Sequence, residues 1–199
     1  MCKVIAVTNR LLCQGDFLEQ ICILGRAGVD QIVLREKDLK ESEYEQLAEK
    51  VLSICEGFPV TCSLHQNIQP ARHLGAKSLH LSLPLAKKYQ RDLEDFEWFG
   101  ISTHSLEQLR EAKEYGADYV FYGHVFATDC KKGMPPRGVY ALQEICREAE
   151  IPVYAIGGIS PENALQAVEA GAAGVCVMSW AMQQDEETIR AFVKKLKVL

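Results

Sequence analysis

The stretch Tyr115-Gly116-Ala117-Asp118 leads directly into the apolar run Tyr119-Val120-Phe121-Tyr122, and this junction shows how the chain is built. Its glycine stands where an amphipathic segment ends and a strand-like run begins, and glycine suits the left-handed residue that closes a helix. The same signal recurs at Ala27-Gly28-Val29-Asp30, Leu74-Gly75-Ala76-Lys77 and Ala170-Gly171-Ala172-Ala173. Helices that stop at glycine just before a strand indicate repeated β/α units.

Outward from these junctions, short apolar runs alternate with amphipathic segments along the whole chain. We expect strands at Val4–Thr8, Gln31–Leu34, Pro59–Leu64, Ser78–Leu81, Phe99–Thr103, Asp118–Tyr122, Pro152–Ile156 and Gly174–Met178. We expect helices near 16–26, 42–56, 67–74, 85–93, 105–115, 138–149, 161–170 and 185–197. Three of them have start signals: Ser42 with Glu45, Ser105 with Gln108, and Ser160 followed by Pro161.

Eight β/α units in 199 residues average about 25 residues each, enough for a strand, a helix and two short loops. Eight parallel strands with right-handed crossovers favour closure over an open sheet. The sequence therefore predicts an α/β fold, a single compact (β/α)8 TIM barrel that occupies residues 1–199 as one domain.

The composition excludes several classes of protein. Hydrophobic residues make up 48% and charged residues 25%, and 22 Lys+Arg against 27 Asp+Glu give a net charge of −5. That charge gives no electrostatic argument for binding nucleic acid or an anionic membrane. No apolar stretch approaches the roughly 20 residues of a membrane span, and no signal-peptide cleavage pattern is present. We expect a cytoplasmic protein that binds neither nucleic acid nor membrane.

Eight cysteines raise the question of disulfides or a zinc site. No pair has CxxC spacing, and five fall in expected helices or strands, namely Cys22, Cys55, Cys62, Cys146 and Cys176. We expect free thiols that pack as small hydrophobic side chains. Cys130, in a polar loop, is set apart from them, and its role stays open.

Polar residues collect where the expected strands end, which is where a (β/α)8 barrel places its active site. They are Arg35-Glu36-Lys37, His65-Gln66-Asn67, Ser102-Thr103-His104, Gly123-His124, the loop Thr128–Gly133, Gly157-Gly158 and Met178-Ser179. Gly157 and Gly158 leave their backbone N–H groups unobstructed, and a short helix after Ser179 would aim its N-terminus at an anion. We expect a phosphate site there, with a plain turn as the alternative.

Arg35 and Lys37 are two residues apart at a strand end, so both side chains can face the barrel mouth. Opposite a phosphate, they would bind a second anion such as a carboxylate. The alternative is a solvated rim in which Glu36 and Asp38 neutralise them locally.

Five histidines compete for a catalytic role. We expect His73 at the surface and His80 as a hydrogen-bonded interior residue, whereas His65 and His104 end strands and can line the site. His124 follows the sixth strand and faces the proposed phosphate site, where a neutral imidazole can take and return a proton near physiological pH. With no HExxH motif and no cluster of paired carboxylates, we expect neither a metal nor a cofactor.

Together these residues resemble the thiamine phosphate synthase/TenI superfamily over essentially the whole chain. The matching signatures are Val33-Leu34-Arg35-Glu36-Lys37, Leu74-Gly75-Ala76 through Leu79-His80-Leu81, Ile101-Ser102-Thr103-His104, Ala117-Asp118-Tyr119-Val120 through Phe126-Ala127-Thr128, Ala155-Ile156-Gly157-Gly158-Ile159 and Gly171-Ala172-Ala173-Gly174-Val175. Several of them occur singly in other phosphate-binding barrels, but their order and spacing together are specific.

Departures from the family pattern separate two branches. Synthases of the family carry Asn-Asp after strand three and Asp after strand four, which hold Mg²⁺ on a pyrophosphate. Here those positions read His65-Gln66 and Ser82-Leu83-Pro84-Leu85, the synthase Gln is Val33, and its second loop Thr is Cys130. Because pyrophosphate displacement needs its charge neutralised, the resemblance argues against synthase activity.

Conversely, Tyr122-Gly123-His124-Val125-Phe126 followed by Thr128-Asp129-Cys130-Lys131-Lys132-Gly133 is similar to the TenI thiazole tautomerases. In these enzymes the histidine that matches His124 is the catalytic acid/base. The resemblance implies conversion of a carboxythiazole phosphate tautomer into the aromatic 2-carboxythiazole ethyl phosphate used in thiamine synthesis. We expect His124 to move the proton and the substrate to be bound by Arg35, Lys37, Ser102, His104, Thr128, Lys131, Gly157, Gly158, Met178 and Ser179.

Three alternatives stay open. They are a thiamine phosphate synthase with an unorthodox metal site, a catalytically silent barrel that binds a phosphorylated metabolite and regulates a partner, and another phosphosugar isomerase. The last lacks any pair of carboxylate or Cys/Asp acid–base residues. Whether His65 assists His124 is also open. Relatives are commonly dimers, so we expect a homodimer, with Phe17, Trp98 and Trp180 as candidate interface residues.

Overall fold

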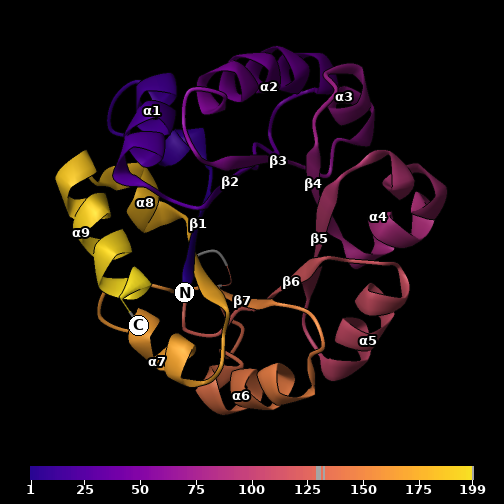
Figure 1. The fold of residues 1–199 in the computed structure, drawn as a ribbon, viewed down its shortest axis with the longest axis vertical. Helices are drawn as coiled ribbons and strands as arrows, with labels where there is room; N and C mark the ends of the chain where they lie inside the picture. The colour runs from indigo at the N-terminus through magenta and orange to yellow at the C-terminus, as the bar shows by residue number, and fades with distance from the viewer. Residues whose placement is uncertain (129–130, 132, 199) are drawn as a thin grey trace.

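The computed structural model describes residues 1–128, 131 and 133–198. Eight parallel strands follow one another around a closed barrel, and β8 pairs with β1 to complete it (Figure 1). The strands are β1 (Lys3–Val7), β2 (Gln31–Leu34), β3 (Thr61–His65), β4 (Ser78–Ser82), β5 (Trp98–Thr103), β6 (Tyr119–Gly123), β7 (Val153–Ile156) and β8 (Gly174–Val177). The predicted TIM barrel is confirmed.

Helices form a ring outside the strands, as Figure 1 shows. They are η1 (Arg10–Leu12), α1 (Phe17–Ala27), α2 (Glu41–Cys55), α3 (Ile68–His73), α4 (Leu83–Lys88), η2 (Gln90–Asp95), α5 (Leu106–Glu114), α6 (Gly138–Glu148), α7 (Ala164–Glu169), α8 (Ser179–Gln183) and α9 (Glu186–Lys197). Of the loop predicted between β6 and α6, residues Asp129, Cys130 and Lys132 lie outside the described residues.

The four glycine junctions have the predicted backbone. Gly28, Gly75, Gly116 and Gly171 have φ of 85°, 62°, 81° and 97°, in the left-handed region where a side chain is disfavoured. Each glycine ends a helix and turns the chain into the next strand. The Ser105 start signal is also confirmed, because its hydroxyl accepts a hydrogen bond from the Gln108 N–H at 3.2 Å.

Two predicted helix starts are wrong. The helix expected from Pro161 begins at Ala164, because the Asn163 side chain accepts from the Ser160 N–H and donates to the Gly158 carbonyl, which holds the intervening residues in a turn. Ser42 does not cap α2. That helix begins at Glu41, and the Glu43 carboxylate accepts from the Lys40 N–H instead.

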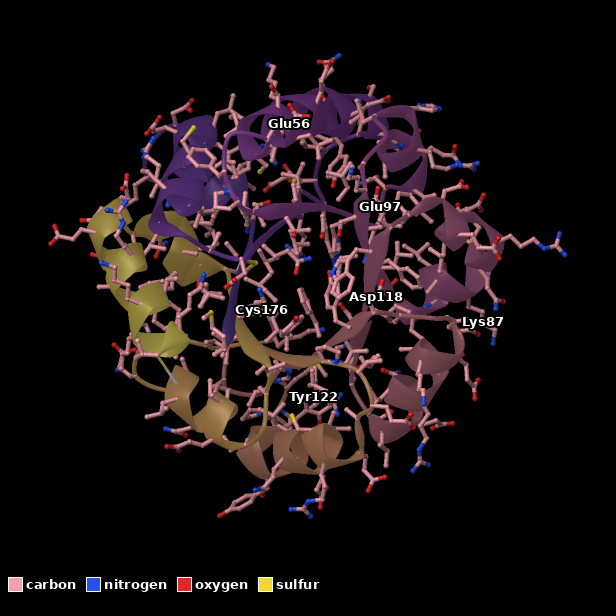
Figure 2. The ribbon with its side chains drawn as sticks, in the orientation of Figure 1. Glu56, Lys87, Glu97, Asp118, Tyr122 and Cys176 are labelled. Atoms are coloured by element: carbon pink, nitrogen blue, oxygen red, sulfur yellow. The ribbon has the colours of Figure 1, made fainter. Side chains whose placement is uncertain are left out.

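Apolar side chains pack in two separate layers. The interior of the barrel is filled from alternate strand positions by Ile5, Val7, Val33, Tyr119, Phe121, Tyr154 and Cys176. A larger cluster lies between the strands and the helices. Figure 2 shows Tyr122 in this second layer, between the barrel and α6, and Lys87 at the outer edge of the molecule. Adjacent side chains of β6 therefore point alternately into the barrel interior and toward the helices, as the two-residue period of a strand requires.

The cysteines and the aromatic residues named in the sequence differ in their exposure. Cysteines 2, 13, 22, 55, 62, 146 and 176 are free, as predicted. Of the three aromatic residues considered for an interface, Trp98 is 37% exposed, whereas Phe17 and Trp180 pack against the core. Within the described ranges, no helix is long and apolar enough to span a membrane.

Gly100 on β5 makes room for the largest interior ring. A Cβ at this position would lie 2.2 Å from two ring atoms of Tyr119, which is fully buried, whereas a Cβ at Gly15 would meet nothing within 4 Å. We expect Gly100→Ala to lower the free energy of unfolding by about 1–3 kcal/mol through overpacking. Gly15→Ala is the matched control, with an expected change within about 0.5 kcal/mol. Urea unfolding measures both, and equal midpoints for the two variants would contradict this packing.

Candidate active site

One cavity of about 310 Å³ lies at the carboxyl ends of the strands. It brings together every residue that the sequence placed in the site, namely Arg35, Lys37, Ser102, His104, His124, Thr128, Lys131, Gly157, Gly158, Met178 and Ser179. His65, Gln66, Ser82 and several apolar side chains complete its lining. The position agrees with the rule that a (β/α)8 barrel carries its active site at this end.

A second cavity, of about 500 Å³, lies at the opposite end of the barrel. It is lined by Thr61, Ser78 and Trp98, with which β3, β4 and β5 begin. Catalytic residues of this fold come from the other end of the strands, so the smaller cavity is the candidate site.

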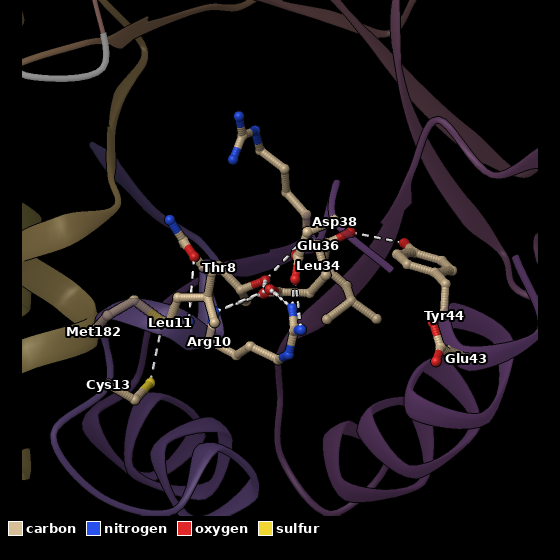
Figure 3. Close-up of polar contacts among 12 residues, drawn as sticks. Thr8, Arg10, Leu11, Cys13, Leu34, Glu36, Asp38, Glu43, Tyr44 and Met182 are labelled. Atoms are coloured by element: carbon tan, nitrogen blue, oxygen red, sulfur yellow. Dashed lines mark hydrogen bonds and ion pairs between the residues drawn. The ribbon is translucent and has the colours of Figure 1, made fainter. Parts of the chain in front are cut away.

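The segment after β2 is fastened by the buried carboxylate of Glu36, which is only 3% exposed. This carboxylate accepts from the Thr8 hydroxyl at 2.6 Å, from the Arg10 N–H at 3.0 Å and from the Arg10 guanidinium at 3.2 Å (Figure 3). The Thr8 hydroxyl in turn accepts from the Arg35 N–H at 2.9 Å. Glu36 therefore points away from the cavity, and its two neighbours in sequence, Arg35 and Lys37, line it.

The carboxylates near Arg35 and Lys37 belong to a different cation. Asp38 accepts from the Arg10 guanidinium at 2.7 and 2.6 Å, and Glu36 shares the same guanidinium. The positive charge of Arg10 is therefore balanced by the carboxylates of Glu36 and Asp38. The two acidic residues of the proposed neutralised rim therefore form their ion pairs with Arg10.

The described cavity lining contains Arg35, Lys37 and Lys131 but no aspartate or glutamate. Partial burial of the Lys37 ammonium, followed by the positive charges of Arg35 and Lys131, lowers the pKa of Lys37. A group whose charge is disfavoured by like charges is stabilised when an anion binds beside it. The electrostatics of the cavity therefore suit a ligand with more than one negative charge.

His124 is 8% exposed, lies directly after β6 and lines this cavity. Its Nε2 lies 3.3 Å from the carbonyl oxygen of Met134. A carbonyl only accepts, so Nε2 carries the proton of the neutral ring and Nδ1 keeps its lone pair. The imidazole can accept a proton at Nδ1 without losing this contact.

Gly157 and Gly158 pack directly against the segment that begins at His124. A Cβ at Gly157 would lie 2.3 Å from the His124 Cβ, and a Cβ at Gly158 would lie 2.3 Å from the Ala127 carbonyl oxygen. Both glycines also have positive φ, 97° and 66°. The backbone itself therefore requires glycine at both positions, whatever binds there. In the described part of the chain, neither glycine N–H donates a hydrogen bond to another protein group.

His80 is an interior residue, as expected, and it supports Ser102. Its Nε2 lies 2.8 Å from the Ser102 hydroxyl and its Nδ1 lies 3.2 Å from the Tyr119 hydroxyl, which accepts from Gln31 at 2.7 Å. This buried chain fixes Ser102 at the edge of the cavity. Burial lowers the pKa of His80 to about 3, so the ring is neutral at physiological pH.

His65 lines the cavity, but its environment disfavours a positive charge. Burial lowers its pKa well below the ordinary value, and the neighbouring His80, Arg35 and Lys37 act in the same direction. Its ring stacks on that of His80, with centroids 6.0 Å apart. Both the burial and the neighbouring positive charges therefore disfavour the protonated form of His65.

Gln66 lies among the polar residues expected after the third strand, but the sequence analysis assigned it no role in binding or catalysis and did not predict its backbone conformation. Its φ of 64° lies in the left-handed region, which costs a non-glycine residue roughly 1–2 kcal/mol. Its N–H donates to the His80 carbonyl at 3.0 Å. Strain of this kind collects at functional sites, but no pattern in the sequence marks it, since the residue is neither glycine nor asparagine.

The lining does not fit a magnesium ion. Mg²⁺ prefers carboxylate and other oxygen ligands in octahedral geometry. The ends of β3 and β4 present His65, Gln66 and Ser82 to the cavity. Among the described residues, no group of three or more His, Cys, Asp or Glu side chains is arranged to hold a metal.

Comparison with known proteins assigns the family. Residues 4–181 match the family described as thiamine monophosphate synthase, TMP-TENI. This chain belongs to the thiamine phosphate synthase/TenI family. That family consists of enzymes of thiamine biosynthesis, so the resemblance seen in the sequence is confirmed at this level.

Alignments with individual relatives cover nearly all of this chain. The thiamine-phosphate synthase 2 of Streptococcus pneumoniae serotype 4 is 32% identical over 98% of this chain and 95% of its own length. The thiamine-phosphate synthase of Syntrophomonas wolfei is 33% identical over 88% of this chain and 86% of its own length. The structure of the thiamine phosphate pyrophosphorylase from Pyrococcus furiosus has a TM-score of 0.83 over 98% of this chain and 94% of that chain, at 24% identity, which shows the same fold.

The buried carboxylate of Glu36 should contribute to the stability of this barrel. We expect Glu36→Gln to lower the free energy of unfolding by about 2–4 kcal/mol. The amide nitrogen would face the Thr8 and Arg10 donors that now bind the Glu36 carboxylate. Asp38→Asn removes the exposed partner of the same guanidinium and should have a much smaller effect, since water screens that pair. Denaturant titration of both variants is the measurement. Equal losses would show that the two carboxylates contribute alike.

The stability of the protein should depend on pH through its buried His80. A histidine that is neutral when folded but protonates near 6.5 when unfolded makes the unfolded chain bind more protons below that pH. The free energy of unfolding should therefore fall as pH decreases from about 6.5 toward 3, by roughly 1.4 kcal/mol per pH unit for His80. His80→Asn should reduce this slope between pH 7 and 5, whereas replacing the exposed His73 by Gln should leave it unchanged. A slope unaltered by the His80 substitution would contradict the assignment.

Proposed function

We propose that this member of the TenI family is a thiazole tautomerase that converts a carboxythiazole phosphate tautomer into the aromatic 2-carboxythiazole ethyl phosphate. The observation that carries the proposal is a buried imidazole in a cavity where, among the described residues, every charged lining side chain is a cation. The reaction moves one hydrogen between two carbons, so it needs an acid–base group and a way to hold a ligand with two anionic groups.

The chemistry follows from the state of His124. Its Nδ1 lone pair takes the acidic hydrogen from ring carbon C2, next to the carboxylate, and the electron pair spreads into the ring toward the exocyclic carbon. The imidazolium then returns a proton to that exocyclic carbon, which leaves the aromatic ring. The Nε2 contact with Met134 holds the ring in both protonation states, because Nε2–H is a donor in each.

We assign the two anionic ends of the substrate to different residues of the cavity lining. The phosphate is proposed to bind the free N–H groups of Gly157 and Gly158 and the hydroxyl of Ser179. The substrate carboxylate is proposed to bind Arg35 and Lys37. The hydrogen bonds of Thr8 with Glu36 and with the Arg35 N–H hold the backbone that carries these two side chains. Ser102, Thr128, Lys131 and Met178 complete the proposed contacts.

Thiamine phosphate synthase is the second candidate, because the relatives carry that name. That reaction releases pyrophosphate and calls for cation-assisted charge neutralisation. The described lining offers no carboxylate for Mg²⁺, so the donor set favours the tautomerase. A regulatory barrel that binds the same phosphorylated ligand without altering it is a third outcome that the experiment below separates.

The test is incubation with the nonaromatic product of a thiazole synthase, with formation of the aromatic thiazole followed by absorbance and NMR. We expect turnover without added metal, and His124→Ala to lower kcat by about 10²–10⁴-fold, the usual contribution of one acid–base group, with little change in ligand affinity. His73→Ala, an exposed histidine remote from the cavity, is the control. Pyrophosphate release with magnesium would instead identify a synthase, and tight binding without conversion would identify a regulatory protein.

A further inference from the structure

We propose that His104 is a second acid–base residue of this site, which delivers a solvent-derived proton to the exocyclic carbon while His124 removes the hydrogen from C2. The inference rests on the proposed function and adds a residue to its mechanism. It follows from the position of the His104 ring, from the partner of its Nδ1 atom and from the properties of the other lining groups.

The tautomer of His104 is fixed by a backbone carbonyl. Its Nδ1 lies 2.6 Å from the carbonyl oxygen of Gly123, which can only accept. Nδ1 therefore carries the proton of the neutral ring, and Nε2 is the atom that gains or loses a proton. A protonated His104 can give up its Nε2 proton and regain one from water without breaking the contact that holds the ring.

The same carbonyl couples His104 to His124. Gly123 is joined to His124 by a peptide bond, and its oxygen also accepts from Arg137 Nε at 3.0 Å. The Arg137 N–H donates to the His124 carbonyl at 3.0 Å. The Gln108 side chain accepts from the His104 N–H at 2.8 Å. The Gly123–His124 peptide thus binds the His104 ring through its carbonyl and carries the His124 ring on its next residue. Both imidazoles line the cavity of about 310 Å³.

The two rings differ in their access to solvent. His124 is 8% exposed, whereas His104 lies at the exposed rim of the cavity. A rim imidazole exchanges protons with water between turnovers, and a buried one does so more slowly. His65, the other histidine of the described lining, has its pKa held well below the ordinary value by burial and by neighbouring positive charge. His104 is therefore the group best suited to supply the second proton.

The steps balance without a co-reactant other than water. His124 Nδ1 forms a bond to the C2 hydrogen as the C–H bond breaks, and the electron pair moves toward the exocyclic carbon. That carbon takes the proton from His104 Nε2, whose electron pair returns to the nitrogen. His124 is now protonated and His104 neutral, and one proton passes from the first to the second through solvent.

This scheme differs from a one-histidine shuttle in the origin of the delivered hydrogen. A single buried imidazole returns much of the hydrogen that it took from C2. With His104 as the donor, the hydrogen that reaches the exocyclic carbon comes from solvent. Turnover in D₂O therefore separates the two, with the deuterium content of the product side chain measured by NMR or mass spectrometry.

The decisive variant is His104→Asn. The asparagine amide can still donate to the Gly123 carbonyl, but it has no equivalent of Nε2. We expect kcat to fall about 10²-fold with KM changed less than about threefold, and the solvent-derived deuterium to fall in favour of hydrogen from C2. His104→Ala, which also removes the anchor, and His73→Asn, a remote control, complete the set.

Each result decides between roles. If His104 only positions the backbone, His104→Asn keeps the kcat and deuterium content of the wild type and only His104→Ala is impaired, which overturns the proposal. If the wild type converts the thiazole and both variants match it, His104 has no part in the reaction. If the wild type leaves the thiazole unchanged, the proposed function fails and this inference fails with it.

Discussion

Closure of the barrel between β8 and β1 is the constraint on which the remaining structure depends. Lys3 and Gly174 stand opposite each other in this pairing, and a Cβ at Gly174 would lie 2.3 Å from the Lys3 carbonyl oxygen. Glycine thus allows the last strand to pair with the first. Because eight parallel strands then point the same way around a ring, their carboxyl ends meet at one mouth. Residues as distant in sequence as Arg35 and Ser179 come to share a single cavity.

The distribution of charge at that mouth depends on where one carboxylate is placed. Glu36 lies between two cations in sequence, and an exposed glutamate there would weaken the attraction of the cavity for anions. In the fold, its hydrogen bonds go to Thr8 and Arg10, on the side away from the cavity. A carboxylate with this many donors is stable when buried, and its negative charge is matched by the Arg10 guanidinium. Of the described residues, Arg35, Lys37 and Lys131 therefore supply the charges that line the cavity.

Much of this architecture could be predicted from the sequence because it depends on local signals. Glycine junctions mark the ends of helices, and the position of a polar residue after a strand places it at the mouth, so the lining was foreseen. What could not be foreseen depends on contacts between distant segments. The start of α7 depends on the side chain of Asn163, the partner of Glu36 lies 26 residues away at Arg10, and the positive φ of Gln66 has no local signal. The contact of His80 with Ser102 likewise needs the register of β4 and β5.

The contact of Gly157 with His124 has a consequence for how such a site can diverge. The loop whose amides are proposed to bind the phosphate also packs directly against His124, with no side chain between them to absorb a shift. A change in this loop that accommodates a different head group would tilt the ring at the same time. Ligand specificity and turnover rate are thereby coupled in this barrel. A change of ligand specificity requires a compensating change in the segment after β6.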